Sequence, residues 1–429
     1  MSSSKNSPPT VRREKVYLGA LGITKLNLKN PFVVACWSAA FPGMGHLLLS
    51  KYLRGFALFF WELFVNYKAS VNLLILYSFT GDFEKAKAVV DIQWLMLYIP
   101  TYLFTIWDSY RATVDLNHMY ILGSREDAEV KPFAMSALEI NYLDQRIPWV
   151  SAIWSLLIPG SAHLYINRFL MGAFLVIFWT VVCYNSNALP ALHYTILGNF
   201  AQAKAVLNMQ WFLNIPSFYM FAMFDGYTCT VENNKLFDWE QAKFLKRDYQ
   251  DSNFIMPSKK SIRGDRMYIV STFEHSIYLE LAITAIQMKG IKKENIMAVP
   301  LDKRGEEAKL FDSIHSADGL SLFDLPAILA TIFGIFGSVY GFIWKWGPLF
   351  WGLIGIAIGF TLGFIIKLMI VKKYNHRQKD RRGAEVVLII DCLESQMEMV
   401  KDTLWAHHSL GVRKLDIANN NIPEGLDNI

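Results

Sequence analysis

The chain has 429 residues, of which 53% are apolar and 14% aromatic, and its formal net charge is +5. An apolar fraction this high is unusual for a soluble protein, and the small positive charge comes without the basic–aromatic clusters typical of nucleic-acid binding. The four cysteines lie far apart and form no C-x-x-C pair, which argues against a disulfide framework and a zinc knuckle.

Apolar residues gather in long runs rather than along one helix face. The clearest runs are 55–64, 94–107, 171–184 and 349–370. Such runs are typical of segments that enter a lipid bilayer, so the sequence predicts a multi-pass protein of the cell membrane. Residues 1–30 carry six basic residues and one acidic residue, without the apolar run of a signal peptide. We expect them to form a basic, disordered tail in the cytoplasm.

The stretch 31–117 occurs twice. Sliding the sequence by 117 positions pairs it with 148–234 without a gap, and about a third of the 87 pairs are identical. A repeat of this kind indicates one duplicated module. Each copy predicts three apolar segments, and residues 118–147 form a mixed-charge linker between the copies.

A Pro-Gly pair interrupts the first segment of each module, at Pro42-Gly43 and Pro159-Gly160. Proline removes a backbone donor, so the segment is either a broken spanning helix or a re-entrant hairpin. Three spans would make the two copies inverted, as is common around transport sites, and two spans would make them parallel. The acidic linker favours three spans, whereas Lys51 and Arg54 favour two. We predict three, and either number leaves the N-terminus, residues 235–320 and the C-terminus in the cytoplasm.

The last third of the chain has a different pattern. After a cytoplasmic linker at 235–266, residues 267–304 and 384–417 each read as strand, helix and strand, and 418–429 form a tail. Two such halves predict a ferredoxin-like domain of the α+β class. The sequence thus predicts a polytopic α-helical membrane protein with a duplicated three-segment module and a cytoplasmic domain interrupted by a transmembrane hairpin.

That hairpin, at 322–371, is rich in glycine. Glycines spaced four apart let helix backbones approach closely, so the hairpin is expected to pack on itself, on the modules or on another protomer, giving a homo-oligomer. A basic run at 367–382 should hold its exit on the cytoplasmic side. The packing glycines are Gly337, Gly341, Gly355, Gly359 and Gly363.

Two resemblances accompany this pattern. The sequence P-G-x-x-H-L, a following basic residue, a glycine about a dozen residues after Pro-Gly and a closing D-x-Y resemble small membrane modules with a PG-x-G-(Q/H)-x-Y hairpin. The first copy departs from this at Leu48, and the second keeps Tyr165 but has Ser161-Ala162. The motifs FEHS, KGI and VPLDKR, at 273–276, 289–291 and 299–304, resemble a family of uncharacterised stress-associated membrane proteins. Both resemblances imply an architecture, and neither implies a reaction.

Ionisable residues inside apolar segments are the sharpest candidates for function, because a charge near the bilayer centre costs at least about 2.5–3.5 kcal/mol. Glu62 either contacts an ion or substrate, or is neutral or paired inside the helix bundle. Asp108 and Asp225 either form a paired acidic site or lie at helix ends in the membrane interface and bond to nearby backbone. We favour the second interpretation. His46 and His163 are expected to donate to a carbonyl freed by the proline, and would reach a metal with the two aspartates only if the modules face each other.

In the cytoplasmic domain, Glu274 and His275 follow a strand end and are a candidate ligand site. The chain lacks the phosphate-binding, dinucleotide-binding, zinc-protease and nucleophile-elbow motifs. We therefore expect no enzyme, catalytic residue, cofactor or metal. Two functions fit: a regulatory, sensing or assembly protein whose cytoplasmic domain senses a small ligand or a protein partner, or a transporter or channel subunit built from the two modules.

Overall fold

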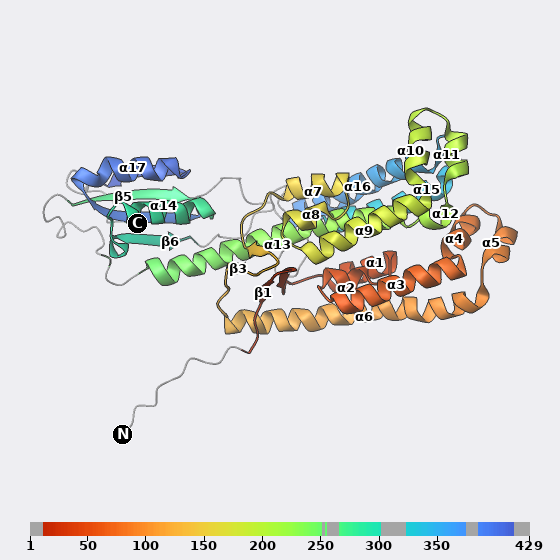
Figure 1. The fold of residues 1–429 in the computed structure, drawn as a ribbon, viewed down its shortest axis with the longest axis horizontal. Coiled ribbons are helices and arrows are strands. Elements are labelled where there is room, and N and C mark those ends of the chain that lie inside the picture. Colours follow the sequence, from red (N-terminus) through yellow and green to blue (C-terminus); the bar gives the residue numbers. More distant parts are fainter. Residues whose placement is uncertain (1–11, 251–253, 255–265, 302–322, 375–384, 416–429) are drawn as a thin grey trace, which may run out of the picture. The chain divides into compact units, whose positions relative to one another are not determined.

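The computed structural model describes residues 12–250, 254, 266–301, 323–374 and 385–415 (Figure 1). The predicted tail at 418–429 and part of the basic run, 377–382, lie outside them. The described chain is mostly helical and divides into two compact units. The helical unit contains Met1–Tyr142, Arg146–Glu232 and Ala308–Gln378. The sheet unit contains Leu143–Gln145, Asn233–Glu307 and Lys379–Ile429.

The two sequence repeats have matching helices in the helical unit. Shifted by 117 positions, the bounds of α1 to α5 are those of α7 to α11. The last helix differs: in the first copy it is continuous although it contains Pro100, and in the second it is divided ahead of Pro216. The first copy has α1 (Pro31–Ala40), α2 (Met44–Leu48), α3 (Tyr52–Ala69), α4 (Val71–Phe79), α5 (Phe83–Val89) and α6 (Ile92–Glu126). The second has α7 (Pro148–Leu157), α8 (Ser161–Tyr165), α9 (Phe169–Ser186), α10 (Ala188–Ile196), α11 (Phe200–Val206), α12 (Met209–Phe212) and α13 (Ile215–Tyr249).

The Pro-Gly break turns the chain back on itself. Helix α1 runs antiparallel to α6, so that the Tyr102 hydroxyl donates to the carbonyl of Ala39 at 2.8 Å. After the break, His46 on α2 again lies beside Asp108, further along α6. A helix of 10 residues is about 15 Å long, half the thickness of a hydrocarbon core. These contacts favour a re-entrant hairpin over a broken spanning helix, and the number of spans per module stays a prediction.

Three described helices are long and apolar enough to span a membrane, and a fourth span arises if α5 and α6, bent by 92°, count as one. The three are α9, α15 (Asp324–Gly341) and the segment Gly347–Ile370 of α16 (Gly347–Tyr374). Helix α3 carries three charged residues, Arg54, Glu62 and Lys68, and so falls outside this group. This composition is compatible with a helical membrane protein.

The five predicted packing glycines lie between α15 and α16. A Cβ atom added to Gly337, Gly355 or Gly359 would lie 2.1 to 2.3 Å from a carbonyl oxygen of the opposite helix. Gly341 and Gly363 face Pro348 and Pro326 at similarly short range. Of the three expected packing modes, these glycine faces serve the packing of the hairpin on itself. An oligomer built through this hairpin would have to use its other faces.

The sheet unit contains four antiparallel strands in the order β6-β7-β5-β8. Apolar side chains of β5 and β7, such as Ile269 and Leu388, are buried together with residues of both helices and with Leu245 near the end of α13. The strands are β5 (Arg266–Phe273), β6 (Ile296–Pro300), β7 (Val386–Leu393) and β8 (Gly411–Leu415), and the helices are α14 (Ile277–Met288), α17 (Met397–Ala406) and the 3-10 turns Lys293–Asn295 and Glu394–Gln396.

The N-terminal region contains ordered structure. Strands β1 (Val16–Gly19) and β2 (Gly22–Lys25) form an antiparallel hairpin whose Ile23 is only 4% exposed. The prediction of a disordered tail is therefore wrong for residues 12–30, because the apolar run at 16–23 contains glycines that let it turn and pack as a hairpin. A second hairpin, β3 (Phe133–Met135) and β4 (Ile140–Tyr142), lies in the linker.

Candidate functional site

Both Pro-Gly breaks place a histidine on a short helix. The glycine after the proline is left-handed, with φ of 97° at Gly43 and 101° at Gly160. A side chain would not fit there, because a Cβ on Gly43 would lie 2.6 Å from the carbonyl oxygen of Gly55. The short helices that follow, α2 and α8, carry His46 and His163, and both rings are fully buried.

In the first copy, a carboxylate lies between an imidazole and a guanidinium. Nε2 of His46 is 2.9 Å from Oδ2 of Asp108 on α6. Arg54, at the start of α3, donates to Oδ1 at 3.2 Å and to Oδ2 at 2.9 Å. The Arg54 side chain is 54% exposed and that of Asp108 is 12% exposed, so the cation of this cluster is open to its surroundings.

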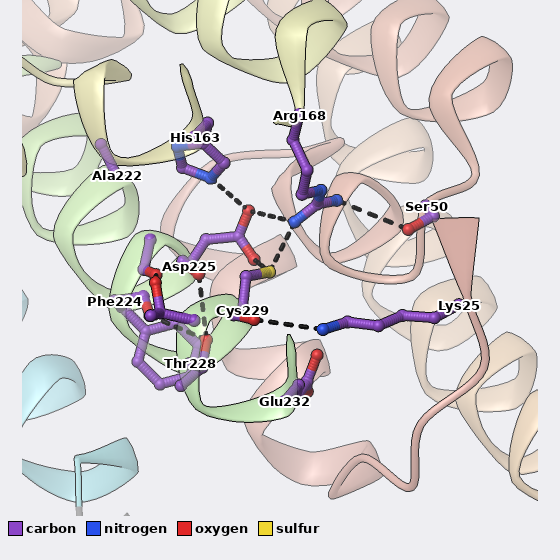
Figure 2. A network of polar contacts seen from close by, with 12 residues as sticks. Lys25, Ser50, His163, Arg168, Ala222, Phe224, Asp225, Thr228, Cys229 and Glu232 are labelled. Carbon is purple, nitrogen blue, oxygen red and sulfur yellow. Dashed lines mark hydrogen bonds and ion pairs between the residues drawn. The ribbon is translucent and has the colours of Figure 1, made fainter. Parts of the chain in front are cut away.

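The second copy has the same arrangement in a closed position (Figure 2). Nε2 of His163 is 2.8 Å from Oδ2 of Asp225 on α13, and Nη1 of Arg168 lies 3.5 Å from the same oxygen. The Cys229 thiol, one turn later, donates to Oδ1 of Asp225 at 3.1 Å and lies against the guanidinium. The exposed fraction is 0% for the His163 and Asp225 side chains and 6% for Arg168. This charge cluster is therefore enclosed by protein.

Arg168 also joins the two copies. Its Nη2 donates to the hydroxyl of Tyr52 at 2.8 Å and lies 3.5 Å from Oγ of Ser50, both in the first copy. A guanidinium has five donors in a fixed plane, so one side chain can hold a carboxylate and a neighbouring module together.

Sequence reasoning missed both arginines as members of the site. They do not occupy equivalent positions: 117 positions before Arg168 stands Lys51, and 117 positions after Arg54 stands Met171. A self-comparison therefore reports neither as a shared residue. The signal that points to them is looser, namely a basic residue within eight positions after each histidine.

Two lysines before α1 extend the polar cluster of the second copy. Lys25 Nζ donates to the carbonyl of Cys229 at 3.1 Å, and Lys29 Nζ lies 2.7 Å from Oε1 of Glu232. Burial lowers the pKa of Lys25 to about 8, although the Glu232 carboxylate acts in the opposite direction. Burial also opposes the charge on Lys29, but Glu232, Cys229 and Asp225 together outweigh it and raise the Lys29 pKa to about 12. Lys29 is thus held as a cation, whereas Lys25 loses its proton at a lower pH than an ordinary lysine.

The predicted partners of the histidines and aspartates are not those that the structure shows. Each histidine bonds the aspartate of its own module rather than a carbonyl freed by proline. The aspartates contact side chains, and they neither pair with each other nor rest on neighbouring backbone alone. Among the residues that the structure describes, no group of three or more His, Cys, Asp or Glu side chains is placed to hold a metal ion. The four residues thus form two separate pairs.

Glu62 belongs to a different network, at the contact between the modules. Its Oε1 accepts from Nδ2 of Asn66 at 3.1 Å, and Gln210 donates to Oδ1 of Asn66 at 2.7 Å. Asn72 in turn donates to Oδ1 of Asn214 at 3.1 Å. Of the two readings of Glu62, the structure supports the one in which it is paired inside the bundle. Glu62 is 3% exposed.

Glu274 and His275 do not face a common site. His275 is 5% exposed, and its Nδ1 lies 3.0 Å from Oε1 of Gln241 on α13. Its backbone N–H donates to Oε2 of Glu385 at 2.8 Å. Glu274 is exposed. His275 therefore joins α13 to the start of α14, and the predicted pair is not assembled.

Each cluster can act as a charged clamp, that is, a set of ionic and hydrogen-bonded contacts that holds two helices together. Charge-assisted bonds from an imidazole and a guanidinium tie each re-entrant hairpin to its long helix. A cavity of about 20 Å³ beside α13, lined by Lys29, Phe224, Thr228 and Asp324 among others, has room for one water molecule and not for an organic substrate.

Comparison with known proteins adds no relative to this description. No protein-family model, curated protein or solved structure matches the chain. The function has to be inferred from the geometry of the chain itself.

Proposed function

We propose that this chain is a multi-pass protein of the cell membrane with a regulatory, sensing or assembly role, and that its sheet unit is a ferredoxin-like domain in the cytoplasm. The strand order β6-β7-β5-β8 with one helix after β5 and one after β7 supports the ferredoxin-like assignment. The basic residues at 1–30 support a cytoplasmic N-terminus, and a two-helix hairpin keeps both halves of the sheet on that side.

The pairing of the strands carries the proposal. Strands β5 and β6 precede the hairpin of α15 and α16, and β7 and β8 follow it. The pairs are β5 with β7, β5 with β8, and β6 with β7. Neither half of the sheet therefore contains a strand pair of its own. The domain forms only when both ends of the hairpin reach the same side of the membrane.

This connection suits a protein that reports on or organises a membrane assembly. A pore needs no soluble domain built around its own membrane hairpin. A domain whose central strand β7 is reached only through the hairpin is covalently coupled to it at both ends. A partner that binds the sheet unit therefore acts on a structure that depends on the hairpin.

One face of the sheet offers a surface for such a partner. Alternate side chains of a strand point to opposite faces, and Ile269, Leu388 and Ala298 point into the core. Val270 and Met297 therefore point to the other face, where both lie opposite Ile389 of β7. These side chains are only partly buried, and they form an apolar row across the sheet. We propose a protein partner here, without a cofactor, nucleic acid or reaction.

A photo-reactive amino acid placed on this face tests the proposal. Val299 belongs to the same face on the edge strand β6, and Met288, at the end of α14 and 84% exposed, is the matched control. We expect light-dependent cross-linking of Val299 to one partner of defined mass in intact cells, and none from Met288. Equal, diffuse labelling from both positions would contradict a specific partner.

A transporter or channel subunit is the second candidate, favoured by the buried Glu62 network between the modules. The turning-back of the chain at the Pro-Gly breaks favours parallel modules, which argues against the analogy with inverted-repeat transporters. Purified protein in liposomes decides between the two. Ion movement that stops in Glu62→Gln or Asp108→Asn, with the fold retained, would favour transport.

A further inference from the structure

The two copies of the module differ in how far equivalent helix faces are covered. On α13 one face of large apolar side chains is buried. On α6 the equivalent residues, 117 positions earlier in the sequence, are exposed. The exposed fractions are 1% for Met220, 1% for Phe221 and 4% for Phe224, against 60% for Leu103, 51% for Phe104 and 54% for Trp107. Both faces are made of large apolar and aromatic side chains, so the difference lies in what packs on them.

The first copy and α15 together cover the face of the second. The Trp37 ring on α1 lies 5.5 Å from the Phe221 ring and 5.1 Å from the Phe224 ring, measured between centroids. Trp37 is 1% exposed. Its counterpart Trp154 on α7 is an identical residue in an equivalent helix, yet it is 48% exposed.

These exposures define the kind of contact between the modules. If a two-fold axis related the two modules, Trp154 would also be buried against Phe104 and Trp107. All three side chains are instead exposed. The contact is therefore heterologous, using the tryptophan face of one module and the long-helix face of the other. Each chain keeps one unused face of each kind.

We propose that the unused faces bind each other between two copies of this chain. Trp154 of one copy would pack on Phe104 and Trp107 of the next, as Trp37 packs on Phe221 and Phe224 within the chain. A second copy is the expected occupant because the chain itself carries both complementary surfaces and already makes this contact once, between its two modules. The inference stands on the helical unit alone and does not depend on the role of the sheet unit.

The contact between copies would differ from the one within the chain in polarity. Within the chain it includes the buried amides of Asn72 and Asn214. The equivalent positions are Leu189 and Leu97, which are 64% and 53% exposed. An interface without buried amides can form and separate without leaving amide groups unpaired. Lipid competes with the second copy for these apolar faces.

Two variants with one added cysteine each test the proposal in a background in which exposed Cys36 is serine. Leu157→Cys and Leu103→Cys, at exposed positions beside Trp154 and Phe104, are placed on separately tagged full-length chains in the same membrane and treated with a short thiol cross-linker. Because the contact is heterologous, a dimer should form when the two variants are mixed and not when either is alone. Trp37→Cys with Phe221→Cys in one chain is the positive control and should give an intrachain link.

A further variant separates a real contact from chance collision. Adding Trp107→Ala should lower the yield of the mixed dimer about tenfold or more, as removal of a central aromatic anchor does. Leu353→Cys mixed with Leu362→Cys, two exposed positions on α16, reports collisions in the lipid. A mixed yield no higher than that of this control would show that lipid covers these faces and would overturn the proposal, as would equal cross-linking of Leu103→Cys with itself.

Discussion

At the scale of single residues, the two clamps show one arrangement in two electrostatic settings. In both, an aspartate on a long helix bonds the Nε2 of a buried histidine. The guanidinium is 54% exposed in the first and 6% exposed in the second. A buried ion pair gains little net stability over apolar residues, but a buried charge that loses its partner is strongly unfavourable. The two clamps should therefore respond differently to the same substitution.

We predict that Asp225→Asn destabilises the protein by about 3–5 kcal/mol, because it leaves Arg168 buried without its carboxylate. Asp108→Asn should cost about 1 kcal/mol or less, since Arg54 remains in contact with its surroundings. The measurement is thermal unfolding of the purified protein in detergent. Equal losses in the two variants would mean that the difference in burial does not govern the strength of the clamps.

Lys25 provides a prediction on pH. Its folded-state pKa is about 8, and the ordinary value is 10.5, so the unfolded chain binds more protons between these values. The contribution of Lys25 to the free energy of unfolding must therefore increase as the pH rises from about 8 to 10.5. In Lys25→Met this rise should disappear, which unfolding midpoints between pH 7 and pH 9.5 would show.

Lys29→Met is the control for this experiment. Because the Lys29 pKa is raised to about 12, Lys29 stays charged in both states up to about pH 10. Its removal should shift the midpoints by a similar amount across the window. A rise that persists in Lys25→Met would assign the pH dependence to another group.

At the scale of elements, sequence reasoning found the long apolar segments of both modules, the glycine hairpin and the four strands of the sheet unit, but not the short helices α5 and α11. It did not find the direction of the chain after Pro42 and Pro159, because a proline break is compatible with either a kink or a reversal. The contacts that decide it, such as His46 with Asp108, join residues 62 positions apart. Side chains at that separation meet only through packing, which single-sequence patterns do not report.

The reversal predicts where the linker lies. With two crossings per module, residues 118–147 share the cytoplasmic side with the N-terminus. Cysteine at the exposed position Ala137 should therefore resist an impermeant thiol reagent on intact cells and react once the membrane is opened. Cysteine at exposed Gln202 on α11, at the other end of the module, should react from outside. Labelling of Ala137→Cys on intact cells would restore three spans.

The glycine hairpin predicts a steric effect confined to one helix face. Gly359→Ala would bring a Cβ atom to 2.3 Å from the carbonyl oxygen of Leu329, so α15 and α16 must separate. Overpacking of this kind costs about 1–3 kcal/mol. The neighbouring Ile358→Ala, on a side chain that is 47% exposed, should cost less. Thermal unfolding of both variants measures the difference, and equal effects would place Gly359 outside a tight contact.

At the scale of the whole molecule, the order of elements along the chain makes the sheet unit depend on a membrane segment. The strand pattern was predictable because Val- and Ile-rich runs flank the hairpin. Which strands become neighbours was predictable only through the analogy with a known four-strand arrangement, since neither β5 and β6 nor β7 and β8 pair with each other. The N-terminal hairpin was missed because short strands among basic residues resemble a solvated tail.

This dependence can be removed without disturbing the sheet. The backbone N–H of Leu301 donates to the carbonyl of Glu385 at 2.7 Å, so the two residues are already neighbours across β6 and β7. Joining them through an Asn-Gly turn, which matches the twist of antiparallel strands, would delete residues 302–384. We predict that a chain of residues 233–301 and 385–415 joined in this way is soluble and unfolds cooperatively.

Each half by itself is the decisive control. Residues 233–301 contain β5 and β6 without β7 between them, and residues 385–415 contain β7 and β8 without β5 between them. Neither half can complete a strand pair, so both should lack sheet structure in circular dichroism, and mixing them should restore it. A folded half would show that the sheet does not need both ends of the hairpin. In that case the coupling of this domain to its membrane segment, on which a sensing or assembly role depends, would lose its structural basis.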